Sequence, residues 1–241
     1  MIFSYPFIVL GTFILWVSWL FFNGGSTLSM FMPRKNGVAK IMMNTILAGS
    51  SAGFVATIVK PHVMGTYSRS NRYDVGALCN GILAGLVSIT ASCNNVTPWM
   101  AFVIGVIGGV VYSYGCKLLD VVNVDDPVEA AAVHGFCGMW GLIATGFFDQ
   151  DQGLFSGNRE KMGAFFGNQW LGLLCICTWT ILTCGLYFFG MKKLGLLRVS
   201  LFDEIIGLDI TEMGSYDPMV VEVFKQYNER KVSDANELEL V

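Results

Sequence analysis

The residue type that stands out for its chemistry is a histidine inside an apolar run. His134 follows the polar segment DDPVE, and the residues from Ala130 to Phe148 are otherwise almost entirely apolar. An ionisable side chain at membrane depth is a candidate functional group by default. A buried imidazole is expected to be neutral, and a neutral imidazole both donates and accepts a hydrogen bond. His134 could therefore handle a small neutral amine or carry a proton, and the simpler alternative is a hydrogen-bonded core histidine.

A second candidate site lies near the end of the first apolar stretch. Trp19, Phe22 and Ser26 are spaced by three and four residues, so they share one face of a helix. An aromatic face attracts a cation, and the serine hydroxyl can accept a hydrogen bond from an ammonium-like ion. The spacing predicts a cation site on this face, and the alternative is an aromatic belt at the membrane interface.

Three acidic residues, Asp125, Asp126 and Glu129, precede the histidine. Asp126 followed by Pro127 predicts a helix start, with the carboxylate as the cap and the proline in the first turn. Glu129 in that first turn would suit the positive end of the helix dipole. We predict that the three residues form a helix cap at the inner mouth of a pathway, with attraction of cations as a secondary role.

The composition places these residues in a membrane protein. Hydrophobic residues make up 54% of the sequence and charged residues only 14%, whereas an average soluble domain is about 25% charged. A net charge of −3 argues against nucleic acid as a partner. The 7 cysteines lie within or beside apolar runs, without zinc-ligand spacing, and are interpreted as buried apolar residues. We expect neither a cofactor nor a metal ion.

Six apolar segments are long enough to cross a bilayer, which takes about 20 residues. The spans are expected at residues 5–30, 41–59, 75–96, 98–116, 130–148 and 163–191. The first is expected to be a span and not a cleaved leader. Residues 1–191 would form a transmembrane domain and residues 192–241 a tail, with both chain ends on one side. The distribution of lysines and arginines favours the cytosolic side for these ends. The predicted fold is an all-α polytopic helix bundle in the plasma membrane.

Glycines four residues apart recur in three consecutive spans. They are Gly49 and Gly53, Gly81 and Gly85, and Gly105 and Gly109. Small residues at this spacing let helix backbones approach one another in lipid. The pattern predicts one compact bundle.

Four segments resemble the ammonium transporter (Amt/Mep/Rh) family, and its Amt branch in particular. They are WLFFNGGS at 19–26, ASCNNVTPW at 91–99, DDPVEAAAVHGFCGMWG at 125–141 and GLDITEMGSYD at 207–217. The block with the DDP and HG motifs, in register with six spans, is highly specific. The tail block departs from the family pattern by having Met213 where a histidine is usual.

The resemblance implies an eleven-span fold of two inverted five-helix repeats plus a last helix, assembled as a homotrimer with a pore in each subunit. This chain resembles the second inverted repeat and the final helix. Trp19 and Ser26 would then belong to the outer ammonium-recruitment site, Phe22 to the gate beneath it and His134 to a pair of pore-lining histidines. In the scheme of this family, ammonium is bound outside and deprotonated, and ammonia passes the histidine pair, with the proton moved separately or returned according to the member.

The resemblance also implies a regulatory tail segment that contacts a neighbouring subunit. Its matching residues here are Gly207, Asp209, Thr211 and Gly214. The first repeat of the family supplies the partner histidine, a second gate phenylalanine, a further tryptophan and an aspartate. Sites in inverted-repeat transporters form between the repeats. We therefore expect a partial or truncated transporter that needs the missing first-half helices.

The leading hypothesis is transport of ammonium or ammonia across the lipid bilayer, with methylammonium as an analogue. The alternative is a non-conducting regulatory subunit that assembles with full-length ammonium transporters. A membrane enzyme is disfavoured, because one histidine without a nucleophile, a metal partner or a second carboxylate is too little for catalysis.

Overall fold

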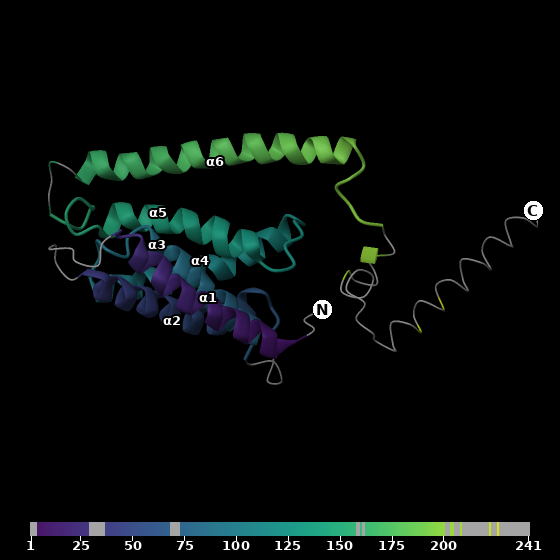
Figure 1. Ribbon diagram of the computed structural model, residues 1–241, viewed down its shortest axis with the longest axis horizontal. Coiled ribbons are helices and arrows are strands. Elements are labelled where there is room, and N and C mark those ends of the chain that lie inside the picture. The colour runs from purple at the N-terminus through teal and green to yellow at the C-terminus, as the bar shows by residue number, and fades with distance from the viewer. Residues whose placement is uncertain are drawn as a thin grey trace, which may run out of the picture. The chain divides into compact units, whose positions relative to one another are not determined.

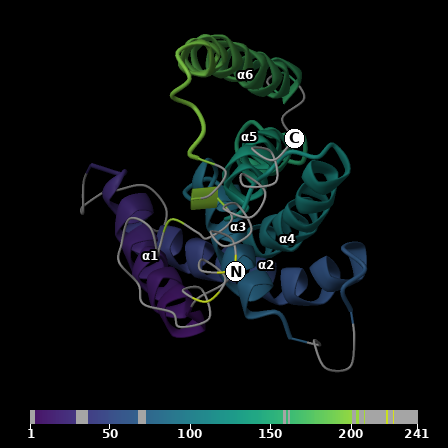
Figure 2. The ribbon, with the colours of Figure 1, turned by 90° about the vertical axis from the view of Figure 1, so that its right-hand side faces the viewer.

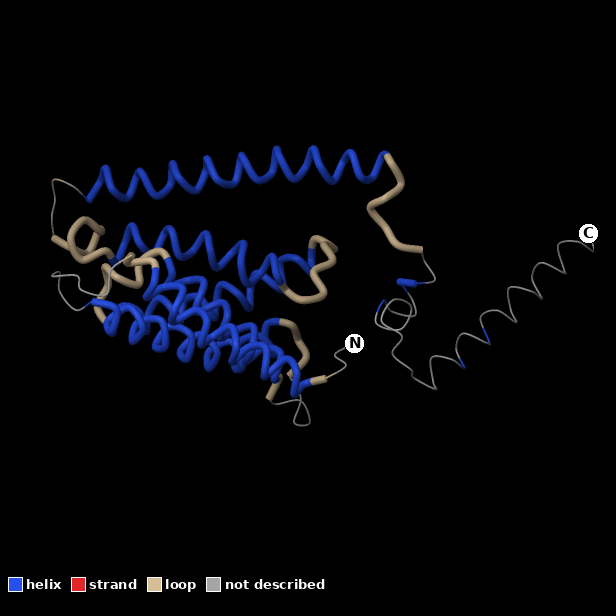
Figure 3. Tube along the Cα trace, in the orientation of Figure 1, coloured by secondary structure: helices blue, strands red, loops and turns tan. Residues whose placement is uncertain are grey.

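The computed structural model describes residues 4–28, 37–67, 73–157, 160, 162–200, 203, 204, 208, 222 and 226. Its elements in chain order are α1 (Tyr5–Gly25), α2 (Gly37–Val63), α3 (Val75–Thr90), α4 (Pro98–Val121), the π-helix η1 (Ala131–Phe136), α5 (Cys137–Phe148) and α6 (Met162–Lys193). Over these ranges the chain consists of helices and connecting loops (Figures 1 and 3). The predicted all-helical fold class is confirmed.

Within the described ranges, five helices are long and apolar enough to cross a membrane, with η1 and α5 counted as one continuous helix, Ala131–Phe148. The span predicted at residues 75–96 is the exception: its helix, α3, is apolar but has only 16 residues, because the chain turns after Thr90. Conversely, α2 continues past the predicted end at residue 59, with Pro61 inside its last turn. The division into a transmembrane domain and a cytosolic tail stays a prediction.

The helices α2, α3 and α4 pack closely through the small residues of their facing sides. A Cβ atom on Gly85 of α3 would lie 2.3 Å from the carbonyl oxygen of Ala48 in α2, and one on Gly105 of α4 would lie 2.4 Å from the same oxygen. A Cβ atom on Gly109 would lie 2.6 Å from the carbonyl oxygen of Ala52. Since a real side chain cannot come this close, these glycines permit direct backbone contact. The predicted compact bundle is confirmed.

The helix α3 lies between α1 and α5 (Figures 1 and 2) and packs against both. Asparagine side chains close one end of this arrangement. Asn44 Nδ2 of α2 donates to the carbonyl oxygens of Cys93 and Val96 at 2.8 and 3.0 Å, in the connection between α3 and α4. Asn95 Nδ2 in the same connection donates to Asp149 Oδ2 at 2.8 Å, just after α5. These bonds hold the end of α3 in a fixed relation to α2 and α5.

The chain divides into two compact units, Met1–Ile176 and Cys177–Val241. In the first unit, α6 begins against the end of α5, where the rings of Phe147 and Phe166 are 4.9 Å apart. Four cysteines of this unit are buried as expected: Cys79, Cys93, Cys116 and Cys137. The expectation fails on α6, where Cys175 and Cys184 are exposed.

Candidate functional site

The predicted aromatic face of α1 exists, and it is attached to α3. The Nε1 atom of Trp19 donates a 2.8 Å hydrogen bond to the hydroxyl of Thr90, the last residue of α3. The ring of Phe22 meets the Trp19 ring edge-on, with centroids 6.0 Å apart, and remains 61% exposed. The Ser26 hydroxyl donates to the carbonyl oxygen of Phe22 at 2.7 Å and is exposed, so its oxygen can still accept a bond from a cation.

A second polar contact holds the same part of α1 against α2. Asn23 is buried, and its Nδ2 atom donates to the hydroxyl of Thr45 at 3.0 Å. Thr45 in turn donates to the carbonyl oxygen of Ile41 at 2.8 Å. The rotation of α1 about its axis is therefore fixed by two side chains, Trp19 and Asn23, that bond to two neighbouring helices.

His134 lies in η1, where the helix is π-helical over Ala131–Phe136. Such turns inside α-helices are frequent at functional sites. The prediction of a buried imidazole is wrong for this chain by itself, because His134 is exposed. A Cβ atom on the adjacent Gly135 would have no described atom within 4 Å apart from its chain neighbours and the nearby backbone of its own helix. The described helices thus leave this side of η1 uncovered.

The glycines that follow His134 bring α5 onto α3. A Cβ atom on Gly141 would lie 2.9 Å from the carbonyl oxygen of Ser88, whereas one on Gly138 would be 3.9 Å from Val87. Gly141 therefore allows α5 to lie directly against the backbone of α3, whereas a side chain at Gly138 would make only an ordinary van der Waals contact.

The aromatic face and the histidine are both positioned by one turn of α3. Thr90 binds Trp19 of α1, and Ser88, two residues earlier, lies against Gly141 of α5. His134 precedes Gly141 by about two turns, roughly 10 Å. The helix runs from there toward the start of α3, since Glu129 contacts Asn80 of α3. The imidazole is thus nearer to the start of α3 than the aromatic face is.

The acidic residues differ in what they contact. The Asp126 carboxylate accepts hydrogen bonds from the backbone N–H groups of Ala130, Ala131 and Ala132 at 2.9, 2.8 and 3.4 Å. The helix nevertheless begins at Ala131, later than predicted from Asp126 and Pro127. The reason is the left-handed backbone of Glu129, with φ at 59°, which no α-helix accommodates. Asp125 is exposed.

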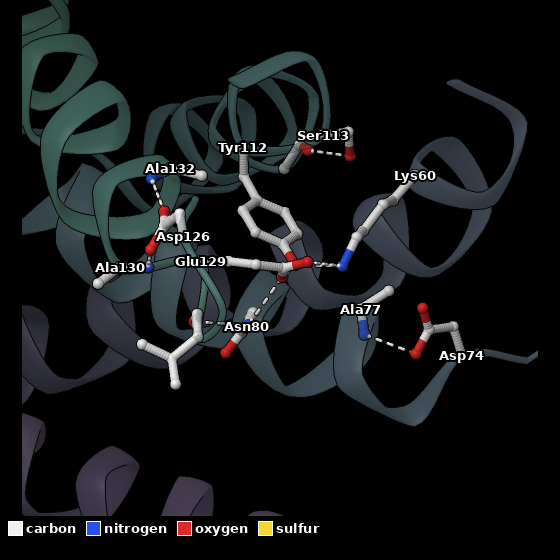
Figure 4. Close-up of polar contacts among 12 residues, drawn as sticks. Lys60, Asp74, Ala77, Asn80, Tyr112, Ser113, Asp126, Glu129, Ala130 and Ala132 are labelled. Carbon is white, nitrogen blue, oxygen red and sulfur yellow. Dashed lines mark hydrogen bonds and ion pairs between the residues drawn. The ribbon is translucent and has the colours of Figure 1, made fainter. Parts of the chain in front are cut away.

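Glu129 is the centre of a polar cluster that the sequence does not reveal (Figure 4). Its carboxylate lies 2.5 Å from Lys60 Nζ and accepts hydrogen bonds from the Tyr112 hydroxyl and from Asn80 Nδ2. Burial alone would raise the pKa of Glu129, but the bonds from Lys60, Tyr112 and Asn80 outweigh it and lower the pKa below its ordinary value. The one signal in the sequence is Lys60, a charge at the end of a long apolar run, which needs a partner when buried.

The predicted regulatory residues Gly207, Asp209, Thr211 and Gly214 lie outside the described residues. Across the part of the chain that the structure describes, no group of three or more histidine, cysteine, aspartate or glutamate residues is arranged to hold a metal ion. The candidate site combines aromatic and hydroxyl groups on α1 and α3 with the imidazole on η1 and the carboxylates in the segment before η1.

Comparisons with known proteins agree with the resemblance. The profile of the Ammonium Transporter Family matches residues 2–217. Ammonium transporter Amt2 of Archaeoglobus fulgidus is 41% identical over 214 residues, which are 86% of this chain and 44% of the relative. Ammonium transporter 1 member 1 of Arabidopsis thaliana is 35% identical over 236 residues, covering 88% of this chain and 45% of the relative. The chain therefore spans less than half the length of these two relatives.

Solved structures give the same result. A sensor Amt protein superposes with a TM-score of 0.73 at 35% identity, covering 87% of this chain and 49% of the other. Mep2 of Saccharomyces cerevisiae superposes with a TM-score of 0.68 at 28% identity, covering 82% of this chain and 47% of the other. With the apolar helices and the family profile, these matches identify the chain as an integral multi-pass membrane protein that belongs to the Ammonium Transporter Family, a family of transporters and not of enzymes.

Proposed function

We propose that this chain is the second half of an ammonium transporter, with its chain ends and tail in the cytosol and its aromatic face toward the outside of the plasma membrane. The observation that carries the proposal is the arrangement on α3. One turn of that helix holds both α1, with Phe22 exposed, and α5, with the exposed His134 nearer to the start of α3.

The residues then act in order along the pathway. The Trp19 ring and the Ser26 oxygen attract ammonium where it is partly desolvated, and Phe22 covers the way inward. An ion cannot continue through the apolar span at low cost, so ammonium gives its proton to water at the outer mouth, forming hydronium there, and neutral ammonia proceeds. His134 can accept a hydrogen bond from ammonia or donate one to it, depending on which ring nitrogen carries the proton.

A conduit needs walls on every side, and the described helices of this chain leave one side of η1 open. The relatives are about twice as long as the matched segment, so helices equivalent to their first half would supply the remaining walls. Sites formed between repeats require both repeats. The proposed working form is thus this chain combined with first-half helices, assembled as a trimer.

The experiment expresses this chain in cells that lack ammonium uptake, alone and together with the part of the Archaeoglobus fulgidus relative that the match does not cover. Uptake of radiolabelled methylammonium should require both halves. His134→Ala should reduce it at least about tenfold, because no other described group on η1 can exchange hydrogen bonds with ammonia. His62→Gln, the matched change at the other histidine, should leave uptake intact. Full uptake with His134→Ala would refute the pathway.

A second candidate is a non-conducting regulatory subunit that inserts into full-length transporters. The exposure of both Phe22 and His134 in the isolated chain favours it, since neither residue is enclosed as conduction requires. Co-expression with a full-length relative separates the two functions. A reduced uptake by that relative, with no uptake by the chain in either combination, would support regulation in place of transport.

A further inference from the structure

The carboxylate of Glu129 joins the segment before η1 to three helices (Figure 4). Its Oε1 atom lies 2.5 Å from Lys60 Nζ of α2, while Oε2 accepts from Asn80 Nδ2 of α3 at 2.8 Å and from the Tyr112 hydroxyl of α4. The side chain of Lys60 is 10% exposed and that of Glu129 26% exposed. A poorly solvated charge is costly without its partner, so this cluster strongly favours one position of Glu129.

The backbone at Glu129 fixes where the next helix starts. With φ at 59°, the residue has a left-handed conformation that is unfavourable for any residue with a Cβ atom. The carbonyl oxygen of Glu129 accepts a 2.9 Å hydrogen bond from the N–H of Val133, so this oxygen already belongs to the hydrogen-bond pattern of the helix that follows. The cluster therefore holds the first acceptor of the helix that carries His134.

The other end of this helical stretch is fixed by packing. Gly141 lies directly against the backbone of Ser88 in α3. Between Glu129 and Gly141, the turn Ala131–Phe136 is π-helical and holds one residue more than an α-helical turn would. Each residue of an α-helix turns the chain by about 100°. If the turn relaxed to an α-helix with Gly141 in place, the residues toward Glu129 would rotate by up to about 100°.

We propose that Glu129, paired with Lys60, is a positioning residue that keeps Ala131–Phe136 π-helical and so sets the direction in which His134 projects. The inference rests on the proposed function, because the direction of the imidazole matters for conduction only if His134 lines the pathway. Glu129 itself does not contact the substrate. It acts on transport through the geometry of η1.

The test exploits the fact that the sequence holds only 2 histidines. The variant His62→Gln leaves His134 as the sole imidazole, and its ring can be observed by nuclear magnetic resonance in micelles after isotope labelling of histidine. In this background, Glu129→Gln should shift the His134 ring resonances by more than their line width or split them. This measurement does not depend on transport. The NMR result can therefore be interpreted even if the chain proves not to transport ammonium.

Two controls separate positioning from general destabilisation. Asp120→Asn removes a carboxylate from the exposed pair with Lys117, 3.0 Å away, and should leave the His134 signal unchanged. Asn44→Ala removes two buried hydrogen bonds far along the chain from η1 and should lower the unfolding temperature without moving the signal. An unshifted signal in Glu129→Gln, or an equal shift in Asn44→Ala, would overturn the proposal.

If Glu129→Gln does not yield folded protein, Asn80→Ala is the decisive variant. It removes one donor to Glu129 without leaving a charge unpaired. The proposal then requires Asn80→Ala to shift the His134 resonances by more than their line width. A resonance at the parental position would refute it.

Discussion

The indole nitrogen of Trp19 and the hydroxyl of Thr90 are joined by a 2.8 Å hydrogen bond between α1 and α3. The Thr90 hydroxyl donates a 2.7 Å hydrogen bond to the carbonyl oxygen of Leu86, so its oxygen is oriented to accept from the indole. The Trp19 ring is therefore held in one direction, and Phe22 rests on its edge. A single hydroxyl at the end of α3 thus orients the aromatic face that the proposed function uses.

The first prediction concerns this hydroxyl. Thr90→Val keeps the shape of the side chain and removes the acceptor, which leaves the partly buried indole N–H without its partner. The free energy of unfolding should fall by about 1–3 kcal/mol. In micelles, the thermal unfolding temperature should fall by roughly 2–4 °C for each kcal/mol lost.

Thr90→Ser is the matched control, because it keeps the hydroxyl and loses only a methyl group. Its unfolding temperature should lie clearly closer to that of the parent chain. In the two-half uptake assay, Thr90→Val should also weaken the apparent affinity for methylammonium more than Thr90→Ser does. Equal behaviour of the two variants would show that the hydroxyl contributes nothing.

The second prediction concerns the close contact of α2 and α3. Gly85→Ala would place a Cβ atom 2.3 Å from the backbone oxygen of Ala48, so the two helices must move apart. Overpacking of this kind typically costs about 1–3 kcal/mol. Thermal unfolding should show a lower transition temperature and a greater tendency to aggregate.

Gly11→Ala is the control for this substitution. Gly11 lies in α1, and apart from its chain neighbours and the nearby backbone of α1 no described atom is within 4 Å of its Cβ position, so alanine there meets no other helix. Alanine in a helix interior is favoured over glycine by about 0.5–1 kcal/mol, so this variant should be as stable as the parent chain or slightly more so. A similar loss of stability in both variants would mean that helix packing is not the cause.

Much of the fold follows from the sequence because a bilayer permits few backbone structures. Apolar segments in lipid must satisfy their own backbone hydrogen bonds, and this makes them helices. The paired glycines then predict which helices approach closely, as the contact of Gly85 with Ala48 confirms. Helix ends are less predictable, since α3 stops at Thr90 and α2 continues through Pro61 because of contacts and turns that no local pattern contains.

In the candidate site, too, contacts within one helix could be predicted from the sequence, whereas contacts between residues far apart in the chain could not. The spacing of Trp19 and Phe22 correctly predicts neighbouring rings, because both lie on one helix. The partner of Glu129 was missed, since Lys60 is 69 residues away in the sequence and only the fold brings them together. The left-handed backbone at Glu129 has no local signature either, and it displaced the predicted helix start.

The third prediction tests the helix cap. Asp126→Ala removes the carboxylate that accepts from three consecutive backbone N–H groups. Loss of such a cap costs about 0.5–2 kcal/mol, so the midpoint of chemical unfolding should fall accordingly. Asp125→Ala changes the neighbouring, exposed aspartate and should have little effect. If both variants lose the same stability, the cause is the local charge and not the cap.

The last prediction is a pH dependence of stability that arises from Glu129. Its pKa is lower in the folded chain than its ordinary value of 4.5, so the folded state holds the proton less tightly than the unfolded state. The stabilisation by Glu129 is therefore fully present above that ordinary value. It is lost as the pH falls through the lower pKa of the folded chain.

The measurement compares the free energy of unfolding of the parent chain with that of Glu129→Gln at about pH 7 and again in acid, at about pH 3. The difference should be large at the higher pH, where the variant leaves the ammonium of Lys60 without its carboxylate. It should shrink in acid, because a protonated glutamate and a glutamine present the same neutral shape to Lys60. Other carboxylates titrate in both chains and cancel in the comparison. A difference that stays constant across the two pH values would mean that the charge of Glu129 does not stabilise the cluster.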